Sequence, residues 1–94
     1  MEKIYIVESA YVQSGYMFNN EKKYFSSKKS ALEEYEKKVQ MMIEDNLDMV
    51  NDKENYNTAT SASKYHRSYH CYYKYQYGAS NFFVEMNAAN LEDE

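Results

Sequence analysis

The stretch KYHRSYHCYYKYQY, from Lys64 to Tyr77, decides the fold. Its alternate positions separate into an aromatic set and a basic-polar set. Because successive side chains of a β-strand point to opposite faces, this alternation predicts a long strand with one aromatic and one polar face. The aromatic set is Tyr65, Arg67, Tyr69, Cys71, Tyr73, Tyr75 and Tyr77.

A helical interpretation of the same stretch accounts for fewer of its tyrosines. Tyr65, Tyr69 and Tyr72 recur at helical steps, but tyrosine is favoured in strands and the alternating pattern includes more of the rings. A strand of this length would span about 46 Å, more than the width of a small domain. We therefore expect a bulge or bend, at His70–Cys71 or at Tyr72–Tyr73.

The composition predicts one small domain over residues 1–94. A chain of this size buries only about 60 to 65% of its unfolded surface, and twelve tyrosines with no tryptophan supply much of the core material. The acidic segment from Leu91 to Glu94 is expected to fray. The chain has a single cysteine, and its N-terminus lacks the pattern of a signal peptide, so we expect a cytoplasmic protein. It also lacks an apolar run long enough to span a bilayer, so we do not expect it in the membrane.

The remaining segments complete an α+β pattern. Apolar residues at three- and four-residue steps, with charged residues on the opposite arc, predict an amphipathic helix from Ser27 to Val50. The other expected segments are a strand over Lys3–Val12, a turn at Gln13–Gly15, a strand over Tyr16–Phe25 bulged at Asn19–Asn20, a loop over Asn51–Ser63, a turn at Gly78–Asn81 and a strand over Phe82–Ala88. We therefore predict a ββαββ fold, with a four-stranded antiparallel sheet and one helix packed on one face.

No catalytic or metal-binding signature accompanies this fold. On a strand, His66 and His70 would lie about 13 Å apart, which is too far to share one ion, and Cys71 would face the other side. Nucleophilic catalysis would need Cys71 beside an oriented base, which alternate strand faces do not provide. We predict that the protein is not an enzyme, binds no metal and needs no cofactor.

The acidic side of the molecule is the first candidate for a binding surface. Between Glu33 and Glu54 there are eight acidic residues and three lysines, giving a net charge of −5. Clustered carboxylates steer a protein towards a basic partner. Tyrosine rings on the face that the helix leaves uncovered are typical interface anchors. The residues predicted to bind a partner protein are Glu44, Asp45, Asp48, Asp52, Tyr72, Tyr5 and Tyr11.

The aromatic strand is the alternative. No acidic residue occurs between Asn55 and Val84, so this stretch carries a formal charge of +3. Basic and aromatic side chains together hold phosphates and stack on bases. Three cations are few, and the tyrosine face is equally explained as the core beneath the helix. The alternative nucleic-acid-binding residues are Lys64, Arg67, Lys74, His66 and His70.

In general character, this small, acidic, cysteine-poor and tyrosine-rich chain resembles the inhibitors that phages use against bacterial defence systems, including anti-CRISPR proteins. The resemblance covers the whole chain, is one of composition, and transfers no functional residue. It implies a binder of a host protein that occupies a basic or nucleic-acid-binding surface in the host cytoplasm. A homodimer formed through an exposed sheet face or an open edge fits either interpretation, as does a small ligand held among the tyrosines.

Overall fold

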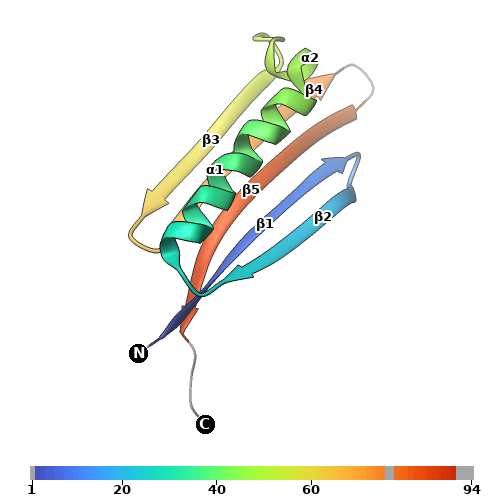
Figure 1. Ribbon diagram of the computed structural model, residues 1–94. Helices are drawn as coiled ribbons and strands as arrows, with labels where there is room; N and C mark the ends of the chain where they lie inside the picture. Colours follow the sequence, from blue (N-terminus) through green and yellow to red (C-terminus); the bar gives the residue numbers. More distant parts are fainter. Residues whose placement is uncertain (1, 76–77, 91–94) are drawn as a thin grey trace.

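The computed structural model describes residues 2–75 and 78–90 as an antiparallel sheet with one long helix across it (Figure 1). The strands lie side by side in the order β2-β1-β5-β4-β3. The elements are β1 (Lys3–Gln13), β2 (Tyr16–Phe25), α1 (Lys28–Asp45), α2 (Leu47–Val50), β3 (Tyr56–Ser63), β4 (His66–Tyr75) and β5 (Gly78–Asn90). The predicted α+β class is therefore confirmed, but the described sheet has five strands, so the four-stranded ββαββ prediction is wrong in that detail.

The additional strand is β3, which falls inside the segment predicted to be a loop. Residues 51–55 do connect α2 to the sheet, but Tyr56 to Ser63 pairs with β4 at every residue. Seven of the eight residues in β3 are exposed. Such a strand has no buried face, and without a buried face there is no alternation of apolar and polar residues to detect.

The turn predicted at Gly78–Asn81 is also wrong, because these residues begin β5 and pair with β4. Pairing of β4 with β5 is continuous from His66 to Tyr75, so the bulge predicted in the aromatic strand is absent from that ladder. The domain is 50 Å long, which leaves room for long strands without a bend. Residues 76 and 77, the end of the predicted aromatic strand, and 91–94, the predicted frayed tail, lie outside the described residues.

The first hairpin is formed as predicted. β1 pairs with β2 across a turn in which Ser14 and Gly15 have φ values of 50° and 85°. A register shift places one extra residue in β2 opposite Ser9 to Tyr11, which confirms the bulge at Asn19–Asn20. Asn19 has a φ of 53°, a conformation that asparagine tolerates better than most residues.

The long helix begins where predicted but breaks before its expected end. The Ser27 hydroxyl caps α1 by accepting a hydrogen bond from the Ser30 amide. At Asn46 the backbone leaves helical geometry, with φ −128° and ψ 37°, and the side-chain amide donates to the Met42 carbonyl oxygen at 2.8 Å. The chain then resumes as the short helix α2, so the predicted helix to Val50 is divided in two at Asn46.

The core lies between α1 and one face of the sheet. Alternate residues of the central strand β5 are fully buried there, namely Phe82, Val84 and Met86. The predicted two-face alternation of the aromatic strand is confirmed, because Tyr69, Cys71 and Tyr73 pack against this core. Cys71 and Met49 bring their sulfur atoms to 3.5 Å, which anchors α2 to the sheet.

The other face of the sheet has no helix over it in the described part of the chain. His70 stacks there on Phe83 and Tyr72, with ring centroids 5.6 and 6.1 Å apart, and its Nε2 forms a 2.9 Å hydrogen bond with the carboxylate of Glu85. We call this surface the open face. No helix in the described chain is long and apolar enough to cross a bilayer.

Candidate functional site

Three acidic residues surround an open groove where α1 meets α2. Glu44, Asp45 and Asp48 lie on either side of the helix break at Asn46, and the groove beside them has a volume of about 470 Å³. Tyr11 of β1, Tyr73 of β4 and Ser80 of β5 also line it, together with Leu47 and Met49. We call this cavity the acidic groove. Because the helix breaks here, carboxylates from the end of α1 and from α2 converge on one opening.

A second hollow continues from the acidic groove towards the first hairpin. It has a volume of about 270 Å³ and shares Tyr11, Asp45 and Asn46 with the acidic groove. Asn19, the bulge residue of β2, forms its far side. Tyr11 therefore stands between two adjoining hollows, beneath the acidic end of α1.

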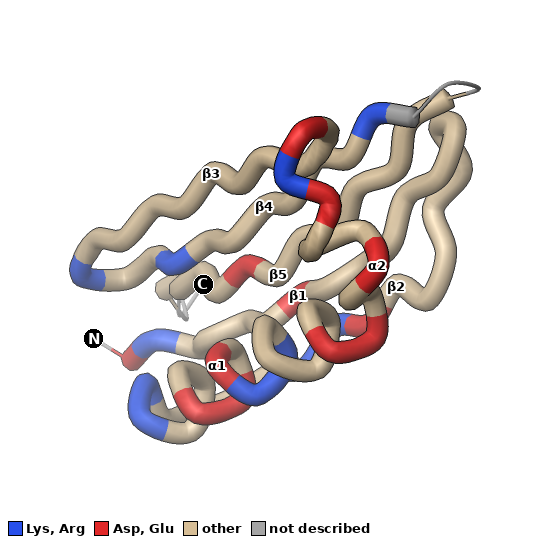
Figure 2. Tube along the Cα trace, turned by 90° about the horizontal axis from the view of Figure 1, so that it is seen from above, with Lys and Arg blue, Asp and Glu red and all other residues tan. Residues whose placement is uncertain are grey.

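The carboxylates of the acidic groove have no basic partners in the part of the chain that the structure describes. Within the described residues, none of Glu44, Asp45 and Asp48 forms an ion pair; Glu44 accepts a 3.1 Å hydrogen bond from Gln40. Figure 2 shows acidic positions at this end of α1 and on α2, with no Lys or Arg position between them. Uncompensated charge at the rim of a concave surface attracts a cationic partner.

Asp52 does not line the acidic groove, but it is bonded to Tyr73, which does, and it is held in place. Its Oδ2 accepts hydrogen bonds from Asn55 Nδ2 at 3.0 Å and from the Tyr73 hydroxyl at 2.9 Å. These hydrogen bonds, chiefly that from Asn55, lower the pKa of Asp52 below its ordinary value. Asp52 is therefore a carboxylate at neutral pH and adds to the negative charge of this end.

Exposed apolar side chains lie next to the acidic groove. Leu47 lines it and is 50% exposed. Phe18, opposite Tyr11 in the β1–β2 ladder and so on the same face, is 48% exposed, and Tyr16 at the hairpin tip is 72% exposed. Large exposed apolar groups beside charges are characteristic of protein-binding surfaces.

Two of the three tyrosines predicted as partner anchors lie elsewhere. Tyr5 is buried in the main core, so its predicted exposure is wrong; β1 is an inner strand, and its odd-numbered residues face α1. Tyr72 is 48% exposed but lies on the open face, across the sheet from Asp45. The structure groups Tyr11, and not the other two, with the predicted acids.

The predicted nucleic-acid-binding residues are divided between the two faces. His66 and His70 lie on the open face, bonded to Asn87 at 2.6 Å and to Glu85 at 2.9 Å. Arg67 points to the helix side and donates to the backbone carbonyl oxygens of Ser63 and His66. Lys74 lies at the far end of β4 from Lys64.

Lys64 belongs instead to a cluster that the sequence did not indicate. The ammonium groups of Lys3, Lys28 and Lys64 lie 4.5, 5.5 and 5.2 Å from the centre of the Tyr65 ring. We call these four residues the lysine cluster. Its members come from three different parts of the chain, so no local pattern could have revealed it. It lies at the end of the molecule opposite the acidic groove, beside the start of α1.

Asn46, Leu47 and Tyr73 were not among the predicted binding residues, although all three line the acidic groove. Of the three, only Asn46 could have been found from the sequence, because an asparagine within a charged helical stretch is a weak sign of a helix break. Among the residues that the structure describes, no three His, Cys, Asp or Glu side chains are grouped to hold a metal ion. Comparison with protein families, with curated proteins and with solved structures finds no match to this chain.

Proposed function

We propose that this protein is a small protein-binding module that receives a basic segment of its partner in the acidic groove. The observation that carries the proposal is the grouping of Glu44, Asp45 and Asp48 around an opening that Tyr11 lines. Among residues 2–75 and 78–90, these three carboxylates have no ion-pair partner. The carboxylates of such a site attract the charged group of a basic side chain, and the tyrosine ring offers a surface to the aliphatic part of the same side chain.

The chemistry of the acidic groove favours an arginine- or lysine-bearing segment. Carboxylates bind a guanidinium through paired hydrogen bonds, and the flat guanidinium also stacks on an aromatic ring such as Tyr11. The apolar side chains beside the acidic groove, Leu47 and Phe18, would cover apolar residues of the same segment. The expected ligand is therefore a segment in which basic and apolar residues alternate.

The biological role that we propose is inhibition by occupation. Protein surfaces that bind nucleic acid are rich in lysine and arginine, because they neutralise phosphates. A module with an acidic groove competes for such a surface. In line with the compositional resemblance to phage inhibitors, we propose a host defence protein as the partner and no chemical reaction as part of the activity.

Nucleic-acid binding is the second candidate, and the lysine cluster is the observation that favours it. Three ammonium groups beside one half-buried aromatic ring could hold a phosphate, and the ring could stack on a base. This candidate now depends on Lys3, Lys28 and Lys64 rather than on the full set along β4.

One experiment separates the two functions. A fluorescent peptide of alternating arginine and leucine, and short single-stranded and duplex oligonucleotides, are each titrated with the protein at low and moderate salt. We expect the peptide to bind and the double variant D45K/D48K to weaken that binding by at least about tenfold. The matched control is E33K/E36K, which makes the same charge change at two exposed positions nearer the start of α1. It should weaken binding by less than about threefold.

An equal loss in both double variants would show that only net charge matters and would overturn the acidic groove as the site. Salt-sensitive oligonucleotide binding that disappears in K3E/K28E/K64E, without peptide binding, would establish the second candidate in its place.

A further inference from the structure

The outer edge of β3 is an open side of the sheet. β3 is the last strand in the order β2-β1-β5-β4-β3 and pairs with β4 over all eight residues with no shift in register (Figure 1). In an antiparallel strand, every second residue directs its N–H and C=O groups away from the neighbour. No backbone hydrogen bond from another described element reaches the outer edge of Tyr56–Ser63. Its outward backbone groups are therefore available to another strand.

This edge lacks the features that usually prevent strands from pairing between molecules. Charged side chains, proline and bulges are the common devices, and β3, with the sequence YNTATSAS, has none of them. Figure 2 shows β3 without a charged position along its length. Asn57 to Ser63 are all exposed, and their side chains are small.

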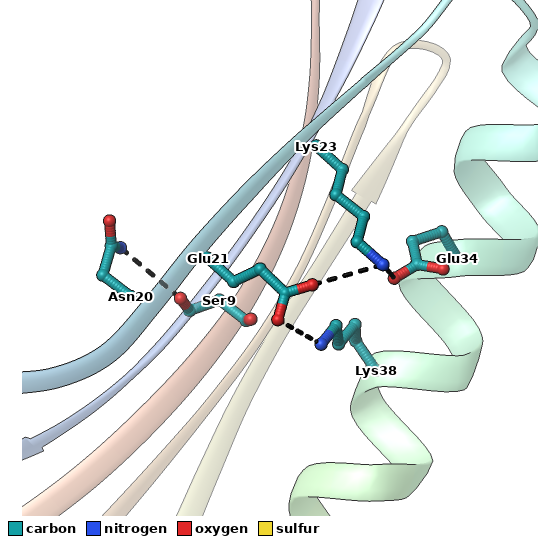
Figure 3. Close-up of polar contacts among 6 residues, drawn as sticks. All are labelled: Ser9, Asn20, Glu21, Lys23, Glu34 and Lys38. Carbon is teal, nitrogen blue, oxygen red and sulfur yellow. Dashed lines mark hydrogen bonds and ion pairs between the residues drawn. The ribbon is translucent and has the colours of Figure 1, made fainter.

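The opposite edge of the sheet is protected in the usual ways. β2 carries the bulge at Asn19–Asn20 and has charged residues in its second half. Glu21 and Lys23 are also tied to α1, through a 2.7 Å contact with Lys38 and a 3.1 Å contact with Glu34 (Figure 3). The contrast between the two edges indicates that the exposure of β3 is a specific feature rather than a general property of this sheet.

We infer that β3 pairs antiparallel with the β3 of a second copy of this chain, which joins two sheets into one of ten strands. A two-fold axis perpendicular to the sheet relates the copies and keeps α1 of both on the same face. The second copy fits because the strand is uncharged, so no like charges meet at the axis even though the whole chain carries −4. The side chains of Asn57 to Ser63 are also small, so those of one copy can lie opposite those of the other without a clash.

The two-fold axis restricts the register. Residues that face one another across an antiparallel pair must point to the same face, so the sum of their numbers is even. Centred on Ala59, the pairing places Thr58 opposite Thr60 and Asn57 opposite Ser61. Threonine pairs across strands are among the favourable combinations.

The helix does not obstruct this contact. α1 packs mainly on β5, β1 and β2, which form the half of the sheet farthest from β3. Because β3 starts near the acidic groove and ends near the lysine cluster, reversal of the strand puts the two acidic grooves of a dimer at opposite ends of one face. Pairing along a single eight-residue edge covers less area than a permanent dimer needs, so the dimer should dissociate on dilution.

Sedimentation equilibrium over a range of concentrations tests the inference. We expect the mass of the wild-type protein to rise from 11.2 kDa towards twice that value as the concentration increases. A59K and A59E should each remain at 11.2 kDa under the same conditions, because like charges then meet at or beside the axis. An equimolar mixture of the two variants should form the dimer again, since opposite charges now face each other.

The mixture also excludes misfolding as the cause, because an unfolded variant could not be restored by its counterpart. The matched control is Y24K, which adds a charge to an exposed position of the β2 edge and should dimerise like the wild type. A wild-type protein that stays monomeric at its highest soluble concentration would overturn the inference. A dimer that persists in both A59K and A59E would also overturn it, because it would have to form through another surface.

Discussion

The Tyr73 hydroxyl donates a 2.9 Å hydrogen bond to the carboxylate of Asp52, which joins β4 to the segment between α2 and β3. Tyr73 lines the acidic groove, so this hydrogen bond holds Asp52 next to a lining residue. The contact therefore links a core-facing residue of the sheet to the charged end of the molecule. Asn55 donates to the same oxygen at 3.0 Å, so Asp52 is fixed by two neutral donors.

The first prediction concerns the pKa of Asp52. N55A should raise the pKa of Asp52 towards its ordinary value of 3.8, and Y73F should raise it by a smaller amount, because the Asn55 hydrogen bond is the larger cause of the depression. A carboxyl group whose pKa is depressed by folding stabilises the fold at pH values above its pKa in the unfolded chain. This contribution is lost as the pH falls through its pKa in the folded protein. The acid side of the stability curve should therefore be flatter in both variants below about pH 4.

Carbon-13 NMR titration of the Asp52 carboxyl measures this pKa directly. S61A is the matched control. It removes the hydrogen bond between the hydroxyl groups of Ser61 on β3 and Ser68 on β4, and it should leave the pKa of Asp52 unchanged. An Asp52 pKa that is the same in wild type and both variants would show that these hydrogen bonds do not form in solution.

The second prediction compares two adjacent phenylalanines on opposite faces of β5. Phe82 is fully buried beneath the helices, whereas Phe83 is half-buried on the open face and stacks on His70. F82A should lower the free energy of unfolding by about 3–5 kcal/mol, because it leaves a cavity in the core. F83A should lower it by about 1 kcal/mol, since the site remains in contact with water.

Urea denaturation followed by circular dichroism gives both values. The two substitutions remove the same atoms from neighbouring positions, so each controls for the other. Equal losses would mean that the open face is covered in solution, for example by a further molecule.

The third prediction concerns the thiol of Cys71. Burial raises the pKa of Cys71 from its ordinary 9.0 to about 11, and the side chain is inaccessible between Met49 and Phe82. At neutral pH this shift reduces the thiolate fraction by about 100-fold. Alkylation by iodoacetamide should therefore be slow in the folded protein and reach an ordinary rate in urea.

The rate of mass increase in intact-protein mass spectrometry measures this reaction. Y24C, which places a second thiol at an exposed position of the β2 edge, provides the accessible reference within the same fold. Modification of Cys71 as fast as that of the reference thiol would show that α2 detaches from the sheet readily.

Local patterns in the sequence were sufficient where a segment has one buried and one exposed face. The tyrosine alternation identified β4 and its faces, and the helical spacing identified α1. β3 could not be recognised in this way, because an edge strand exposed on both sides carries no such pattern. Its extended conformation is due to pairing with β4, which is a contact between segments rather than a property of Thr58, Ala59 or Ser61 alone.

The residues of the candidate site also fall into those that the sequence could predict and those that only the fold brings together. Glu44, Asp45 and Asp48 are close together in the sequence, so their grouping on the surface was predictable, and only the break at Asn46 was not. Tyr11 and Tyr73 reach the acidic groove from two different strands, and their positions depend on the order of the strands in the sheet. Tyr5 was misplaced for the same reason, since whether a strand is covered depends on its neighbours.

The sequence alone thus determined the α+β class, the long helix, the two faces of the aromatic strand and the acidic character of one surface. These features depend on the period of side chains along a single segment, which is set by local geometry. The tertiary structure decided the fifth strand, the open β3 edge, the acidic groove around Tyr11 and the lysine cluster. Each of these brings together residues that are distant in the chain, and their proximity follows from which strands pair and which face the helix covers.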